Sequence, residues 1–255
     1  MLRIFLFFLF FFSSTFSKTI SANYSVEFGI VGEVAQVTAS LTTTPTTYTL
    51  NATVKSVGTI ATTITRNLRE RHISTGKIID GLLVVDRYQM IRYYSDLTST
   101  TIYTLNHKRK RLSKHYIKWQ KKKNHKKRKI KEWRERLNYY SHDDMLTLFL
   151  NLHKHIKNKY TKKHYLFKAV GADRKNGRVD IDIPSEKKAK EMQELLGKPK
   201  EGDWFAKVIM HRKLYKSQNG ELEVKINKEG FLDFAVLKDL IFFGDVRIIK
   251  QPDEK

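Results

Sequence analysis

The stretch Ser141-His142-Asp143-Asp144-Met145-Leu146-Thr147-Leu148-Phe149-Leu150-Asn151-Leu152 decides the fold, because it predicts one strongly apolar helix in the middle of the chain. Apolar residues recur in it at the i, i+3, i+4, i+7 and i+11 positions of one helical face, namely Met145, Leu148, Phe149, Leu152 and Ile156. Leu146 and Leu150 widen that face. We therefore expect a helix that is buried on most of its sides.

Both ends of this helix carry typical end signals. Ser141 is a suitable N-cap, and Asp144, three residues later, resembles the acidic member of a capping box. Basic residues, which the negative end of the helix dipole favours, crowd the other end: His153, Lys154, His155, Lys157 and Lys159. The sequence thus predicts a helix over Ser141–Ile156.

The residues before this helix predict strands. Tyr24, Val26, Phe28 and Ile30 alternate with small or polar residues, which is the period of a half-buried strand. Further extended segments are expected at 34–41 and 48–54, joined by a turn at 42–47, and at 69–73 and 78–85, joined by a turn at Ser74-Thr75-Gly76; strands at 88–94 and 100–105 follow. Residues 57–68 fit either a strand or a helix, and both readings stay open.

The residues after the central helix continue this pattern. Strands are expected at 165–169 and 179–183, with a turn at Lys175-Asn176-Gly177. A second helix is expected to begin after Ser185 and to end at Gly197. The last strands are expected at 204–214, 222–226, 231–236 and 246–249.

Short, successive strands with brief connections predict an α+β fold with an antiparallel meander. We expect a single domain at residues 23–255, built as a curved antiparallel sheet or half-open barrel whose concave face packs on the central helix. The chain of 255 residues is long enough to bury a real core.

The net charge of +23 comes from 49 basic and 26 acidic residues. Most of the excess lies in a basic insert at residues 107–137, which holds 11 Lys and 5 Arg against two Glu, a net charge of +14. The end of this insert is expected to be helical, since Ile130, Trp133 and Leu137 have helical spacing. Its lysine-rich first part is expected to be at best a marginal helix in the absence of a counter-anion, because like charges repel.

Basic residues interleaved with aromatic ones suit a phosphate-bearing surface. The candidate polyanion-binding residues are Lys108, Arg109, Lys110, Arg111, Lys121, Lys122, Lys123, Lys126, Lys127, Arg128 and Lys129. The alternative is a solvated, disordered loop that binds nothing.

The N-terminus indicates export. Arg3 precedes the apolar run Phe5–Phe12, and small polar residues follow at 13–17, as in a secretory signal peptide. We assign residues 1–22 to this signal, with cleavage after Ser17 or after Ala22. The alternative, an uncleaved anchor, is disfavoured because a membrane span needs about 20 apolar residues. A periplasmic or cell-envelope location favours an anionic membrane or another envelope polyanion as partner, and disfavours nucleic acid.

Catalytic signals are weak. The absence of cysteine excludes disulfides, thiolate metal sites and cysteine nucleophiles. The sequence contains no Gly-x-Ser-x-Gly elbow and no phosphate-binding glycine loop. His142-Asp143-Asp144 could bind a metal or act in acid–base chemistry, but helix capping explains it better. His153 and His155 face different sides of a helix, and Asp180 and Asp182 are expected on the solvent face of a strand. We expect no enzymatic activity, cofactor or metal.

Four segments together resemble the Domain of Unknown Function 3108 family of exported bacterial proteins: 24–32, 48–58, the central helix from Asp144 to Leu152, and 243–248. The resemblance implies an envelope location and a β-rich fold around a packed helix, and it implies no activity. The basic insert is richer in lysine than this family suggests.

These observations predict a non-catalytic envelope protein that binds a lipid or another hydrophobic ligand, or that assists envelope assembly. The hydrophobic ligand would lie in an apolar groove of the shell. The alternative function is polyanion binding through the basic insert. The sequence specifies neither the ligand nor the oligomeric state.

Overall fold

The computed structural model describes residues 17–121, 127–172, 176–210, 221–240 and 244–252. The strands of this part form one antiparallel sheet of fourteen strands, in the order β8-β7-β6-β5-β4-β3-β2-β1-β14-β13-β12-β11-β10-β9. The strands of its N-terminal half are β1 (Lys18–Phe28), β2 (Gly32–Thr43), β3 (Thr47–Ser56), β4 (Arg69–Ile79), β5 (Leu82–Tyr93), β6 (Leu97–Asn106), β7 (Arg111–Lys121) and β8 (Lys127–Leu137).

The C-terminal half of the sheet consists of β9 (Lys163–Lys168), β10 (Arg178–Ile183), β11 (Trp204–Met210), β12 (Glu221–Ile226), β13 (Leu232–Leu240) and β14 (Gly244–Lys250). The helices are a short 3-10 turn at Gly29–Val31, α1 (Thr59–Thr65), α2 (Met145–His155) and α3 (Glu186–Leu196). Residues 57–68, for which two readings were open, thus contain a short helix.

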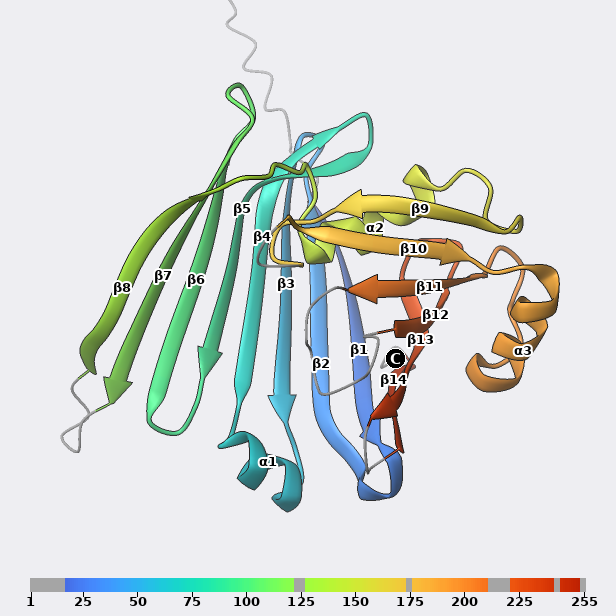
Figure 1. The fold of residues 1–255 in the computed structure, drawn as a ribbon, viewed down its shortest axis with the longest axis horizontal. Helices are drawn as coiled ribbons and strands as arrows, with labels where there is room; N and C mark the ends of the chain where they lie inside the picture. The colour runs from blue at the N-terminus through green and yellow to red at the C-terminus, as the bar shows by residue number, and fades with distance from the viewer. Residues whose placement is uncertain (1–16, 122–126, 173–175, 211–220, 241–243, 253–255) are drawn as a thin grey trace, which may run out of the picture.

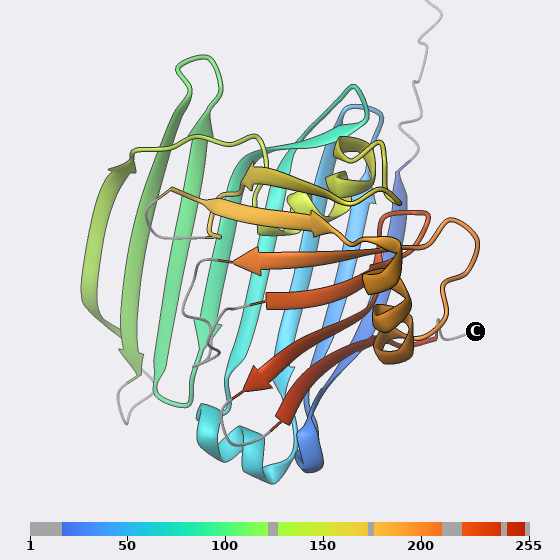
Figure 2. The ribbon, with the colours of Figure 1, turned by 45° about the vertical axis from the view of Figure 1, so that its right-hand side comes forward.

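The sheet is strongly curved and open, with β8 and β9 as its two edges. Figures 1 and 2 show the long strands β2–β8 as one curved wall, with the C-terminal strands running at a steep angle to it and α2 on the concave side. The predicted α+β class, with a curved antiparallel sheet around a central helix, is confirmed. No helix of the described residues is long and apolar enough to cross a bilayer.

Helix α2 is apolar on two faces and packs against both halves of the sheet. Leu148, Leu152 and Ile156 are fully buried in the largest core cluster, together with side chains of β10–β13 that include Val179, Ile181, Trp204, Val224 and Ala235. On its other face, Leu146 and Leu150 contact Tyr48, Leu50 and Leu83 of β3 and β5. The burial expected on most sides of this helix therefore results from its position between two sheet halves.

The N-cap of α2 differs from the prediction. Asp144 caps the helix: its side chain accepts hydrogen bonds from the backbone N–H groups of Leu146 (2.8 Å) and Thr147 (2.9 Å). The Thr147 hydroxyl accepts the N–H of Asp144 in return, which completes a capping box. Ser141 lies before the helix, where its hydroxyl donates to the Lys168 carbonyl. The helix starts later than predicted because Asp144 satisfies its first free N–H groups.

Helix α3 was predicted correctly, with Ser185 as its N-cap. It lies on the outer face of the C-terminal strands, where Met192 and Leu196 are buried against Phe205 and Val236. Trp204 and Ala206 point to the opposite face, toward α2. The C-terminal half of the sheet is thus covered on both faces.

The turn predicted at Ser74-Thr75-Gly76 is wrong. Strand β4 runs through these residues to Ile79, with a bulge at Thr75/Gly76, and the chain reverses at Asp80-Gly81, where both residues have positive φ (51° and 75°). A Cβ atom on Gly76 would lie 2.0 Å from the Val84 carbonyl oxygen. Glycine is needed here because the two strands approach closely. In the sequence, such a glycine looks the same as one that marks a turn.

The helix predicted near the end of the basic insert is also wrong. Residues 111–121 and 127–137 form the antiparallel pair β7–β8 at one edge of the sheet. Leu112 is fully buried, and Leu137 packs on the same cluster. Pairing with β6 and burial of these two leucines outweigh the helical spacing of Ile130, Trp133 and Leu137. The described residues 111–121 and 127–137 of the insert are part of the sheet, and Leu112 and Leu137 contribute to the core.

Strand β1 begins at Lys18, so the predicted domain start at residue 23 falls inside a strand. The hairpin β2–β3 and the pairing of β9 with β10 agree with the prediction. Most of the predicted signal peptide, the end of the strand predicted at 204–214 and the turn predicted at 217–220 lie outside the described residues.

Candidate ligand-binding site

An apolar groove of about 300 Å³ lies between α2, strands β1–β3 and the C-terminal strands. Helix α2 contributes Met145, Leu146, Phe149 and Leu150 to it. The sheet contributes Ile20, Ala22, Tyr24, Val37, Ala39, Ser40, Leu41, Leu50, Ala52, Leu222, Leu232 and Ile248, and the loop before β13 adds Gly230 and Phe231. None of the described lining residues carries a charge, so the groove suits an apolar ligand.

The floor of the groove is a row of three alanines. Ala22, Ala39 and Ala52 are direct cross-strand neighbours on β1, β2 and β3. The next row along the same strands is Ile20, Leu41 and Leu50. Because side chains on one face lie opposite each other across a sheet, the small row leaves space beneath α2 that the larger row would fill. The sequence thus creates the groove by placing its smallest apolar residues in register.

Tyr24 is the most polar large side chain of the groove. Burial, helped by the negative charge of Asp233, raises its pKa to about 12, so the phenol is uncharged at neutral pH. The groove therefore stays neutral over the physiological pH range.

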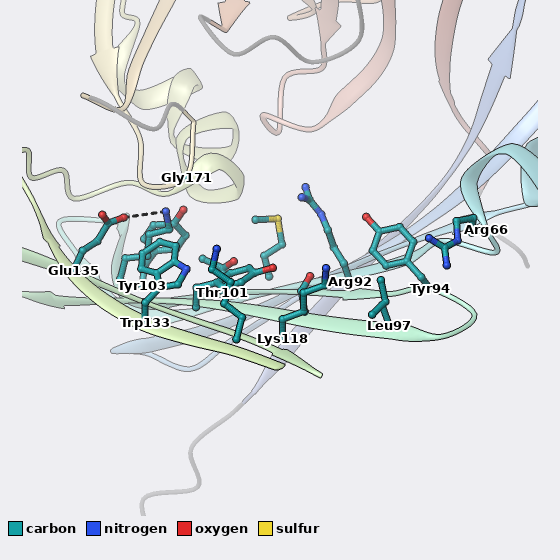
Figure 3. A pocket seen from close by; sticks show the side chains of 15 residues that line it. Arg66, Arg92, Tyr94, Leu97, Thr101, Tyr103, Lys118, Trp133, Glu135 and Gly171 are labelled. Carbon is teal, nitrogen blue, oxygen red and sulfur yellow. Dashed lines mark hydrogen bonds and ion pairs between the residues drawn. The ribbon is translucent and has the colours of Figure 1, made fainter. Parts of the chain in front are cut away.

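A second and larger cavity, about 810 Å³, lies on the concave face of strands β5–β8 (Figure 3). Its lining is cationic and aromatic, with Arg66, Arg92, Lys114, Lys118 and Lys131 beside Tyr94, Tyr103, Tyr116 and Trp133. Met90, Leu97, Ser99, Thr101, Glu135 and Gly171 complete it. We call this cavity the cationic cleft. Its chemistry suits an anionic ligand and differs from that of the groove.

Three of the five cations in the cleft have carboxylate partners. Arg92 donates to Glu70 at 3.0 Å, Lys114 pairs with Glu135 at 3.1 Å, and Arg66 pairs with Asp96. Burial alone would raise the pKa of Glu70, but hydrogen bonds from His72 and Arg92 outweigh it and lower this pKa to about 2. Within the described residues, no ion pair joins Lys118 or Lys131 to a carboxylate.

The structure does not bring the predicted polyanion-binding residues into one site. Residues Lys108, Arg109 and Lys110 form the β6–β7 turn and Arg111 begins β7, whereas Lys121, Lys127, Arg128 and Lys129 lie at the opposite end of the β7–β8 pair (Figure 1). The eleven residues of β7 separate the two groups by about 33 Å. Lys122, Lys123 and Lys126 lie outside the described residues.

The basic residues that do line a cavity were not among the predicted polyanion-binding residues. Lys114, Lys118 and Lys131 alternate with Tyr116 and Trp133 on the concave face of β7 and β8. The alternation Lys114-x-Tyr116-x-Lys118 could have identified them, because a period of two residues places side chains on one face of a strand. The density of charge at the ends of the insert obscured it.

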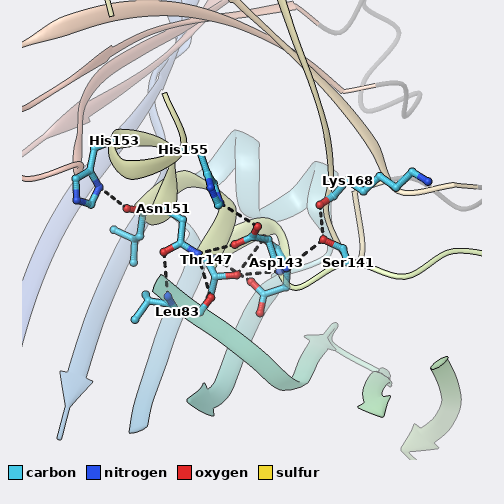
Figure 4. Close-up of polar contacts among 10 residues, drawn as sticks. Leu83, Ser141, Asp143, Thr147, Asn151, His153, His155 and Lys168 are labelled. Atoms are coloured by element: carbon cyan, nitrogen blue, oxygen red, sulfur yellow. Dashed lines mark hydrogen bonds and ion pairs between the residues drawn. The ribbon is translucent and has the colours of Figure 1, made fainter. Parts of the chain in front are cut away.

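Two members of the His142-Asp143-Asp144 cluster hold α2 in place: Asp143 takes part in a hydrogen-bond network with this helix (Figure 4), and Asp144 caps it. Asn151 of α2 accepts the N–H of Leu83 at 3.0 Å and donates to the Leu83 carbonyl at 3.0 Å, and it also donates to Asp143 at 2.6 Å. The other Asp143 oxygen lies 3.3 Å from His155. This buried network attaches α2 to β5. Among the described residues, no group of three metal-ligating side chains converges.

The surroundings of His153 and His155 agree with the prediction, and those of Asp180 do not. His153 contacts the Leu150 carbonyl at 2.6 Å, away from His155, so the two histidines do face different surroundings. Asp180 was expected on a solvent face, and this is wrong: it is 2% exposed and accepts two hydrogen bonds of 2.7 Å from Arg178. The ion pair with Arg178 of the same strand offsets the free-energy cost of burying this carboxylate.

No family model matches the chain, and no curated protein matches it. Among solved structures, the chain is similar to the β-barrel-like protein of Domain of Unknown Function DUF1849 from Brucella abortus. That similarity has 10% sequence identity and a TM-score of 0.42, and it covers 91% of this chain and 94% of that chain. The resemblance to Domain of Unknown Function 3108 stays a prediction.

Proposed function

We propose that this protein is a non-catalytic binding protein of the cell envelope that holds a hydrophobic ligand in the groove under α2. The observation that carries the proposal is an uncharged groove of about 300 Å³ above a floor of three alanines. Protein interiors are close-packed, and an apolar cavity of ~150 Å³ can already hold a benzene-sized molecule. A groove about twice that size suits a short acyl chain or part of a longer lipid.

The envelope location rests on the leader sequence, with Arg3 before an apolar run and small residues up to Ser17. A protein that carries a lipid segment outside the cytosol needs an apolar site with no charged lining residue, which the groove supplies. The proposal includes no reaction, cofactor or metal.

Binding of an uncharged fluorophore, N-phenyl-1-naphthylamine, tests the groove directly. The Ala39→Phe variant adds a ring to the middle of the alanine row and is expected to weaken binding at least tenfold. The matched control is Thr38→Phe, because Thr38 is the exposed neighbour on the other face of β2. The control is expected to bind within twofold of the unmodified protein.

Thermal unfolding of both variants separates loss of the site from loss of the fold. A folded Ala39→Phe protein that binds the fluorophore normally would remove the groove as the ligand site. Failure of the unmodified protein to bind it at all would do the same.

The alternative, polyanion binding through the ends of the insert, is supported by the net charge of +14 over residues 107–137. It is weakened by the separation of about 33 Å between its two basic groups, since β7 extends at ~3.3 Å per residue. Deletion of the insert is not a clean test, because it would remove two strands and the buried Leu112. Co-sedimentation of the intact protein with anionic vesicles at low and high salt tests it instead: binding lost at high salt supports it, and binding that survives favours the groove.

A further inference from the structure

The cationic cleft contains a row of side chains that continues across five strands. In this row each residue is the direct cross-strand neighbour of the next, in the order Glu70, Arg92, Ser99, Lys118, Lys131. Figure 3 shows Arg92 and Lys118 rising from the same face of the sheet. Cross-strand neighbours lie about 5 Å apart, so the ammonium groups of Lys118 and Lys131 share one small region of the cleft.

This pair of lysines destabilises the sheet in the absence of an anion. Like charges directly opposite each other on a sheet repel. The neighbouring cations of the cleft are neutralised by Glu70 and Glu135, whereas no described carboxylate pairs with Lys118 or Lys131. Lys118 is half-buried and Lys131 is exposed, so solvent screens their repulsion only in part. A multiply charged anion between the two ammonium groups would remove the repulsion.

The next row on the same face supplies an apolar and aromatic surface. It consists of Met90, Thr101, Tyr116 and Trp133, again direct cross-strand neighbours. The rings of Tyr116 and Trp133 stack with centroids 5.4 Å apart and planes at 27°. Two residues along a strand span about 7 Å. The aromatic row therefore lies about 7 Å from the lysine row, which is close enough for one small molecule to contact both.

We propose that the cationic cleft binds a phosphate monoester, with its phosphate between Lys118 and Lys131 and its organic part against Tyr116 and Trp133. A phosphate monoester carries nearly two negative charges at neutral pH and accepts hydrogen bonds from several directions. Lysine binds phosphate as a point charge, whereas a planar carboxylate is matched better by the arginine fork. The half-buried Ser99 hydroxyl, opposite Lys118, is a further donor.

This site is separate from the proposed hydrophobic-ligand groove, since no residue that the structure describes lines both cavities. The same phosphate chemistry could come from a lipid headgroup or from a soluble organic phosphate. Two probes distinguish these sources: glycerol 3-phosphate in solution, and phosphatidylcholine vesicles containing phosphatidic acid.

The test is titration of the full chain with each probe. Calorimetry measures binding of glycerol 3-phosphate, and co-sedimentation measures binding of the vesicles. The Lys118→Ala/Lys131→Ala variant is expected to lose at least tenfold in affinity. The control removes the same charge outside the cleft and outside the candidate polyanion-binding residues, in Arg134→Ala/Lys187→Ala, where both residues are exposed. It is expected to stay within twofold. Without ligand, the Lys118→Ala/Lys131→Ala variant is expected to unfold at a higher temperature than the control.

Each outcome decides the proposal. Binding of both probes supports the phosphate site, and binding of the vesicles alone assigns it to a lipid headgroup. Equal affinity of the two double variants, or no binding of either probe by the unmodified protein, would overturn it. Binding of a single-stranded oligonucleotide that needs both lysines, without binding of either probe, would replace it with a nucleic-acid surface. The Ala39→Phe variant should keep its phosphate affinity, which separates this test from that of the groove.

Discussion

The carboxyl group of Asp144 is fully buried at the start of α2 while it caps the helix. Burial raises its pKa to about 6, although hydrogen bonds from the N–H groups of Thr147 and Leu146 favour the charged form. The folded protein therefore holds this proton more tightly than the unfolded chain, in which the usual pKa is 3.8. Stability from this group is present below pH 4 and is lost as the pH rises toward 6.

Asp144→Asn is expected to remove this pH dependence, because asparagine also caps helices and does not titrate. A shift of two pKa units corresponds to about 3 kcal/mol. The unmodified protein should therefore lose up to about 3 kcal/mol of its free energy of unfolding through this group between pH 4 and pH 7.5, and the variant should not. Urea unfolding at the two pH values measures it. The control is Asp80→Asn in the exposed β4–β5 turn. An identical difference at both pH values would contradict the assignment.

At the scale of elements, α2 has one face that stabilises the fold and one that lines the groove. Leu148 is 1% exposed in the core, and its neighbour Phe149 is half-buried in the groove wall. Leu148→Ala is expected to lower the free energy of unfolding by about 2–5 kcal/mol, as large-to-small core substitutions do, and to change fluorophore binding little. Phe149→Ala is expected to cost less stability and to weaken fluorophore binding about tenfold.

Denaturant unfolding and fluorophore titration of these two variants form one comparison. The opposite ranking, with binding lost in Leu148→Ala and kept in Phe149→Ala, would mean that the ligand does not lie between α2 and the alanine row.

At the scale of the whole molecule, the N-terminal strand connects the two halves of the sheet, since β1 pairs with β2 on one side and β14 on the other. Cleavage after Ser17 would leave β1 whole, whereas cleavage after Ala22 would remove five of its residues, including Ile20 and Ala22 of the groove. We expect the mature protein to begin at Lys18. Mass spectrometry of the protein from fractionated cells measures this directly.

A chain that begins at Asn23 is expected to unfold at a lower temperature and to bind the fluorophore more weakly, because one alanine of the groove floor is missing. An intact Met1 on the protein in the cell would contradict export with cleavage. It would also restore nucleic acid as a candidate partner for the basic residues.

Local patterns in the sequence predicted most elements and few of the contacts. Alternation over 48–54 and helical spacing over 145–156 depend on neighbouring residues, and both segments have the expected structure. The signal for the groove was present as Ala22, Ala39 and Ala52, but their register depends on hairpin geometry that no single strand reveals. Gly76 was misread because a glycine needed for close strand approach and one needed for a turn have the same local signature.

The sequence by itself determined the α+β class, the central helix and the concentration of positive charge, since these follow from composition and from periods of two and 3.6 residues. Only the tertiary structure decided which charges act together. Pairing of β7 with β6 and β8 placed the basic residues at 108–111 and 127–129 at opposite ends of the β7–β8 pair and left Lys118 and Lys131 side by side in a cleft. Their proximity depends on strand register, which arises from contacts between residues far apart along the chain.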